Sequence, residues 1–133
     1  MAARRRIDPA DGARAVRDWA AGVDRGGAPA SPAERGARRR TMATAVRFTL
    51  EELAACAPGR AVEVRVPPFG VTQAVSGTVH RRGTPPSVVE TDGATWLALA
   101  TGRLDWGRAL ADGALHASGE RCDISSHLPL MRA

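Results

Sequence analysis

The residues best suited to chemistry form one short segment between two predicted strands. It reads His80, Arg81, Arg82, Gly83 and Thr84. Two guanidinium groups beside an imidazole and a hydroxyl could hold a phosphate or a carboxylate, because guanidinium groups bind such anions through paired hydrogen bonds. The segment is not a P-loop, since no helix follows it to supply backbone N–H groups. A weak anion site is one interpretation, and a solvated connection whose arginines pair with Glu90 or Asp92 is the other.

The remaining reactive side chains are scattered. Cys56 and Cys122 lack CxxC spacing, which favours two reduced thiols over a disulfide. Cys122 and His127 are spaced too loosely to define a nucleophile and its base, and Cys56 is expected to lie in the core at an apolar helix end. The three histidines are far apart and form no metal-ligand pattern. The sequence therefore predicts a protein that is not an enzyme and has no metal or cofactor site.

Two helices are predicted before the first strand. Asp8 can cap the first one, with a proline at its first position. The capping box at residues 31–34 begins the second. The spacing of its apolar residues allows one helix as far as Ala57, or two helices with a break near Phe48, where Thr49 opens another capping box. Residues 1–30 are therefore predicted to be an N-terminal helix and linker, and residues 31–133 a separate α+β domain.

Strands and short helices make up the rest of the chain. Alternating apolar residues predict strands at residues 61–66, 71–76, 87–91 and 114–118. Between the last two strands, Asp92 and Asp105 can cap short helices that end at Gly102 and Gly113. The first three strands are expected to follow one another as a meander. The order indicates an α+β fold with a mainly antiparallel sheet of four to five strands, covered on one face by helices.

The apolar faces of these elements predict a cavity between the valine face of the sheet and the two short helices. Its expected lining comprises Val64, Val66, Trp96, Leu99, Trp106, Leu110, Leu115 and Leu128. Ligand pockets are mostly apolar with a few polar groups, which is the character of this set. The alternative is that the same side chains fill the core at ordinary packing density.

The order of turns, short helices and strand after Thr91 is typical of a known protein family. A helix opened by Asp92 leads to a Gly-Arg-Leu turn at residues 102–104, then a short helix, a turn at Gly113 into a strand, and Gly119-Glu120. Together with VEVRVPPFGVTQ upstream, this order resembles the sterol carrier protein family, and its short stand-alone bacterial members in particular. The resemblance covers about residues 41–131. It implies a sheet with helices on one face and an apolar tunnel for lipids or fatty-acyl groups.

Charge is distributed unevenly along the 133 residues. All 19 basic residues are arginine. Residues 1–40 carry ten arginines and five acids, so their net charge is 10 − 5 = +5, whereas residues 41–133 carry nine of each and are neutral. The body of the protein has no basic surplus for phosphate neutralisation, so we expect no specific nucleic-acid binding. No apolar window approaches the roughly 20 residues of a membrane helix, and no secretory signal is evident. We expect a soluble cytoplasmic protein.

The sequence thus predicts non-enzymatic binding or carriage of a hydrophobic small molecule, such as a lipid, a fatty-acyl group or a sterol-like compound. The alternative is a protein-interaction module that uses the N-terminal helix and the basic loop 79–86, without bound lipid. Trp19 distinguishes them: packing at a cavity mouth favours the carrier, and exposure on a detached helix favours the module. The oligomeric state is left open.

Overall fold

The two N-terminal helices begin where their capping residues predict. The computed structural model describes residues 5–77 and 87–133. Helix α1 (Pro9–Arg25) starts after Asp8, whose carboxylate accepts the N–H of Asp11 at 3.2 Å. Helix α2 (Pro32–Cys56) starts after Ser31, whose hydroxyl accepts the N–H of Glu34 at 3.1 Å. These side chains satisfy N–H groups that lack partners within the helix.

Helix α2 is a single helix with no break near Phe48. Thr49 does not open a second helix. Its hydroxyl donates to the carbonyls of Ala45 at 2.8 Å and Val46 at 3.0 Å, one turn earlier. A threonine can make this bond in the middle of a helix, so its side chain need not interrupt the helix. The single-helix alternative is therefore confirmed.

The sheet has four strands in the order β2-β1-β3-β4. These are β1 (Val62–Val66), β2 (Gly70–Ala74), β3 (Ser87–Thr91) and β4 (Leu115–Ser118). The two outer pairs are antiparallel, and the central pair β1–β3 is parallel, with Val62 opposite Ser87. The predicted meander was wrong, because β3 pairs with β1 and not with β2. The buried face gives the reason: Val64 and Val89, opposite each other in the central strands, are fully buried, whereas Thr72, opposite Val64 on β2, is only half-buried, so β2 suits an edge.

Two short helices precede β4. Helix α3 (Gly93–Ala100) begins after Asp92, whose carboxylate accepts the N–H of Thr95 at 2.8 Å. Gly102, with φ +78°, follows it in the left-handed conformation that ends many helices. Helix α4 (Trp106–Ala111) is capped by Asp105. After β4 the chain makes one 3₁₀ turn, η1 (Ser125–His127), and the tail returns to α3, where the N–H of Leu130 donates to the carbonyl of Ala100.

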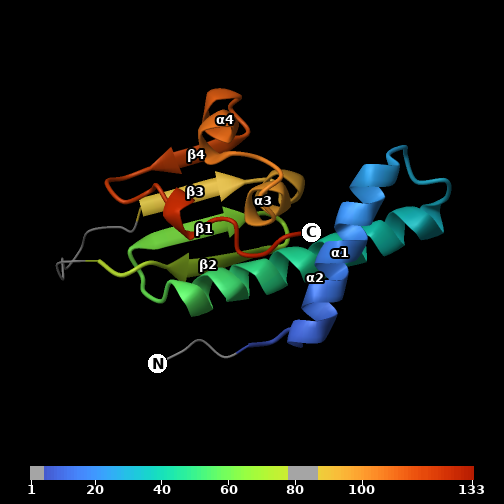
Figure 1. Ribbon diagram of the computed structural model, residues 1–133, viewed down its shortest axis with the longest axis horizontal. Coiled ribbons are helices and arrows are strands. Elements are labelled where there is room, and N and C mark those ends of the chain that lie inside the picture. Colours follow the sequence, from blue (N-terminus) through green and yellow to red (C-terminus); the bar gives the residue numbers. More distant parts are fainter. Residues whose placement is uncertain (1–4, 78–86) are drawn as a thin grey trace.

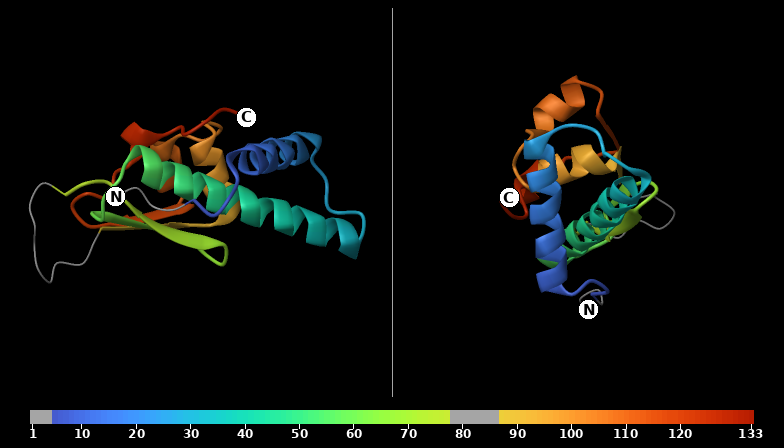
Figure 2. Two further views of the ribbon diagram at one scale, coloured as in Figure 1. Left: turned by 90° about the horizontal axis from the view of Figure 1, so that it is seen from below. Right: turned by 90° about the vertical axis from the view of Figure 1, so that its right-hand side faces the viewer.

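The helices lie on one face of the sheet, as predicted. Figure 1 shows α2 running along the sheet and projecting beyond it at its N-terminal end, with α1 crossing it. Figure 2 shows α2, α3 and the tail on the same side of the strands. The molecule is therefore an α+β protein with a mixed sheet in which two of the three strand pairs are antiparallel.

The crossing of α1 over α2 depends on a glycine. A Cβ atom on Gly12 would lie 2.2 Å from Cγ of Phe48, far closer than atoms can approach. About one turn after Gly12 on α1, Ala15 and Val16 belong to the buried core cluster. The buried face of helix α1 therefore packs against the same core as the other elements. The division into residues 1–30 and 31–133 stays a prediction.

Candidate functional site

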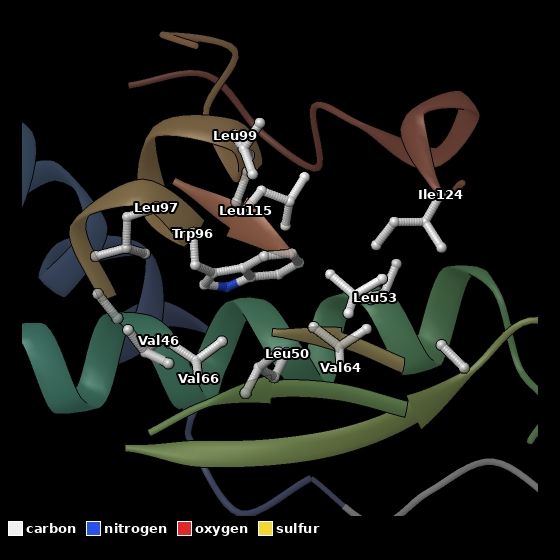
Figure 3. Packing of buried hydrophobic residues seen from close by; sticks show 14 of the residues in the cluster. Val46, Leu50, Leu53, Val64, Val66, Trp96, Leu97, Leu99, Leu115 and Ile124 are labelled. Carbon is white, nitrogen blue, oxygen red and sulfur yellow. The ribbon is translucent and has the colours of Figure 1, made fainter. Parts of the chain in front are cut away.

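Most of the residues predicted to line a cavity lie in the core. Val64, Val66 and Trp96 are fully buried, and Leu99, Leu115 and Trp106 are almost so. In Figure 3 the indole of Trp96 lies between the α2 side chains and Leu99 and Leu115. The structure brings these six residues into one cluster.

Leu110 and Leu128 are placed differently from the other six. Leu110 of α4 is 42% exposed, because Ala109 and Trp106 form the buried side of that short helix. Leu128 is half-buried and packs against the edge of the core cluster.

The polar atom inside this cluster has a dedicated partner. The indole N–H of Trp96 donates to the hydroxyl of Thr49 at 2.8 Å, and both side chains are fully buried. The Thr49 hydroxyl donates to its own helix, so its free lone pair can accept the indole hydrogen. Every buried side-chain nitrogen and oxygen among the described residues is hydrogen-bonded. Such satisfied polar atoms are characteristic of a packed core.

The sequence-predicted anion site lies outside the described residues. His80, Arg81, Arg82 and Thr84 all fall within residues 78–86, so the site stays a prediction. The carboxylate suggested as an alternative partner for these arginines, Asp92, has a local role, since it accepts both the N–H and the hydroxyl of Thr95.

The cysteines are free thiols in different surroundings. Cys56, expected in the core, is exposed at the last residue of α2, so that expectation was wrong. Desolvation raises the pKa of its thiol, which disfavours the reactive thiolate. Cys122 is half-buried. Over residues 5–77 and 87–133, no three histidine, cysteine or acidic residues gather in a way that could hold a metal ion.

A cleft that the sequence did not predict opens between α1 and α2. Its volume is about 470 Å³, within the range of small-molecule sites. It lies between the C-terminal half of α1 and the N-terminal half of α2. The apolar part of its wall comes from Trp19, Val23, Ala37 and Met42. The polar part comes from Asp18, Arg25, Glu34, Arg38 and Thr41, and Gly22 of α1 and Gly26 and Gly27 of the linker complete the wall.

The sequence shows that the residues of the cleft are apolar, but it does not predict that they lie close together in the fold. Trp19 and Val23 lie one turn apart on α1, and Met42 lies on α2 across a linker rich in glycine and proline. Only the angle at which α1 crosses α2 brings them to one cleft. The apolar residues of the first helix were the available signal, but the sequence did not identify the surface against which they pack.

One arginine holds the C-terminal end of α1 in place. Arg103 donates to both carboxylate oxygens of Asp24, at 2.8 and 3.1 Å, and its guanidinium carbon lies 5.8 Å from the ring centroid of Trp19. Its hydrogen bond to Asp24 lowers the pKa of that carboxyl. Arg103 also donates to the carbonyl of Ala133 at 3.2 Å. The Gly-Arg-Leu turn thus connects α1 with the C-terminal tail, a role that its sequence did not reveal.

The N-terminal end of α1 is attached separately. The carboxylate of Glu51 accepts the backbone N–H groups of Arg6 at 2.9 Å and Ile7 at 3.3 Å. Beside it, Arg5 forms an ion pair with Glu52. Both acids lie near the end of α2, so α1 is attached at its two ends and through its buried face.

The charged groups at the linker end of the cleft differ in their bonding. Arg38 donates to Glu34 at 2.9 Å and to the carbonyl of Gly27 at 3.0 Å. The second carboxylate oxygen of Glu34 accepts the N–H of Ala30 at 2.6 Å. That bond, together with the one from Arg38 and a weaker attraction to Arg25, lowers the pKa of Glu34. Arg25 itself forms no hydrogen bond or ion pair with any described residue.

The comparisons identify the family of the chain. A family model described as bacterial SCP ortholog matches residues 38–130, which is more than half of the sequence. A search of curated proteins gives no match. Across the described ranges, no helix has the length and apolar character needed to cross a membrane. Helix α1 and much of the cleft wall lie before the matched residues. The extent of the match shows that the chain belongs to the bacterial SCP ortholog family, whose members are sterol carrier-like proteins.

Proposed function

We propose that this protein is a non-enzymatic carrier that binds a hydrophobic small molecule in the cleft between α1 and α2. A lipid, a fatty-acyl group or a sterol-like compound would each meet the apolar wall. Family membership supports the general role. The observation that carries the proposal is the cleft itself, whose volume of about 470 Å³ lies beside the half-buried indole of Trp19.

The core is a poorer place for a ligand than the cleft. Trp96, Leu97 and Leu99 have almost no exposed surface, and the Trp96 indole is already hydrogen-bonded to Thr49. A ligand there would have to displace close-packed side chains and break that bond. In the cleft, by contrast, Val23 is 51% exposed and would lose contact with water when a ligand binds. Burial of apolar surface contributes about 25 cal/mol per Å².

The arrangement of Trp19 favours the carrier over the interaction module predicted as the alternative. Helix α1 is attached to α2 and to Arg103, so Trp19 is not presented on a detached helix. The basic loop 79–86, which the alternative also requires, lies among the residues that the structure does not describe. The two free thiols suit a reducing compartment, and we place the carrier in the cytoplasm.

A titration of delipidated protein tests the proposal. We expect saturable binding of a fluorescent fatty acid or acyl-CoA, with a change in the tryptophan emission of the protein, because Trp19 lies in the cleft wall. Mass spectrometry of protein purified without delipidation should recover a bound amphiphile. Absence of both saturable binding and recovered lipid would contradict the carrier function.

A further inference from the structure

The charged groups around the cleft indicate what kind of head group a ligand would carry. Four charged side chains line it, of which Glu34 and Arg38 are bonded to each other. The nearby Asp24 is held by Arg103. The other two, Asp18 and Arg25, form no hydrogen bond or ion pair with any described residue. They lie seven residues apart on α1, about two helical turns, so they occupy opposite ends of the same helix face.

Arg25 is better placed than Asp18 to bind the charged group of a ligand. Residues 25–40 carry five arginines and one acid, so this segment has a net charge of 5 − 1 = +4. The single acid, Glu34, accepts hydrogen bonds on both carboxylate oxygens and offers little to an incoming cation. The five N–H donors of Arg25 form no bond within the described protein. A planar guanidinium in this state is a receptor for a carboxylate or a phosphate.

We infer that the cleft binds an amphiphile with one negatively charged oxygen head, and that Arg25 binds that head while the apolar chain lies against Trp19, Val23 and Met42. The inference rests on the proposed carrier function and adds the ligand class and the specificity-determining residue. Helix α1 precedes the residues matched by the family model, so this head-group site is a feature of the chain's own N-terminal helix. A carboxylate and a phosphate share the required chemistry.

Calorimetric titration with four twelve-carbon probes tests the inference. Delipidated protein is titrated below the micelle concentration with dodecanoate, dodecyl phosphate, dodecanol and dodecyltrimethylammonium. We expect at least one anionic probe to bind about tenfold more tightly than dodecanol, because a hydrogen-bonded charge strengthens binding by more than a neutral contact. The stronger of the two anions distinguishes a carboxylate ligand from a phosphate ligand.

Two variants assign the effect to one residue. Arg25→Gln should weaken binding of the preferred anion about tenfold and leave dodecanol within twofold. Arg17→Gln is the matched control, since Arg17 is also exposed on α1 but does not line the cleft. It should bind all probes as the wild type does.

Four results would overturn the inference. Equal affinity for dodecanol and both anions, or an Arg25→Gln variant that binds the anions normally, would remove the head-group site and leave the carrier intact. Preference for dodecyltrimethylammonium would assign the head to Asp18. If no probe binds, the inference falls together with the proposed function.

Discussion

Arg103 and Asp24 lie 79 residues apart in the sequence and form a bidentate ion pair, with N–O distances of 2.8 and 3.1 Å. Arg103 belongs to the segment that matches the family model, and Asp24 belongs to α1, which does not. The pair therefore joins the segment that matches the family model to a helix that precedes this segment. It also fixes one wall of the cleft, because the same guanidinium faces the ring of Trp19.

Breaking this pair should loosen one end of α1 without unfolding the protein. We expect Asp24→Asn to speed amide hydrogen exchange in the last turns of α1, with little change in Tm, because exposed ion pairs add little to global stability. Arg108→Gln, which removes the exposed pair between Arg108 and Asp112 in α4, is the control and should leave α1 unchanged. Unaltered exchange in Asp24→Asn would show that α1 is held without Arg103.

The same pair predicts an acid dependence. The pKa of Asp24 is lowered from 3.8 by its hydrogen bond with Arg103, so the folded state binds this proton more weakly than the unfolded chain does. The stabilisation is therefore complete above pH 3.8 and is lost as the pH falls through the lower folded value. An NMR titration of the Asp24 carboxyl should give a pKa below 3.8, and Arg103→Gln should return it towards that value. A pKa at or above 3.8 in the wild type would contradict the pair.

The hydrogen bond between Thr49 and Trp96 should stabilise the folded protein. Thr49→Val keeps the shape of the side chain but removes the acceptor, which leaves the buried indole N–H unpaired at a cost of about 1–3 kcal/mol. Thr101→Val is a matched control, since the nearly buried Thr101 hydroxyl donates only to backbone carbonyls. Denaturant unfolding should therefore show a clearly larger loss for Thr49→Val. Equal losses for the two variants would mean that the indole bond is not important for stability.

Two glycines of α1 should respond to alanine in opposite directions. Gly12→Ala would press a Cβ into Phe48 at the crossing of the two helices and should destabilise the protein by about 1–3 kcal/mol. At Gly22, the nearest atom to an added Cβ is Nη2 of Arg25, at 3.8 Å, which is an ordinary contact. Gly22→Ala should stabilise the helix by about 0.5–1 kcal/mol. Thermal unfolding of both variants measures this, and a harmless Gly12→Ala would show that the helices do not cross as described.

The features predicted correctly from sequence are those decided by neighbouring residues. Ser31, Asp92 and Asp105 cap helices because each acts on N–H groups within its own first turn. The alternation in β1 likewise reports which face is buried. The family resemblance also rested on a local pattern, which includes the turn at Gly102, and the family match confirms it.

The features that were missed depend on contacts between distant residues. Nothing in β3 itself shows that it pairs with β1 and not with β2. Thr49 has the local pattern of a cap, but its partner Trp96 makes it a core residue. The cleft depends on the docking angle of α1, which the close approach of Gly12 to Phe48 makes possible. A pattern that reports only local preference cannot determine these arrangements.

The most direct test of the carrier site compares two valines. Val23, 51% exposed, lines the cleft, and Val71, 59% exposed, lies on the edge strand β2 and is not among the residues that line it. Fluorescent fatty-acid titration of Val23→Glu and Val71→Glu measures the effect of one new carboxylate at each position. We predict that Val23→Glu raises the Kd about tenfold or more, because the carboxylate must lose water beside the bound chain, and that Val71→Glu leaves the Kd unchanged. Unchanged affinity in Val23→Glu would contradict ligand binding in the cleft between α1 and α2.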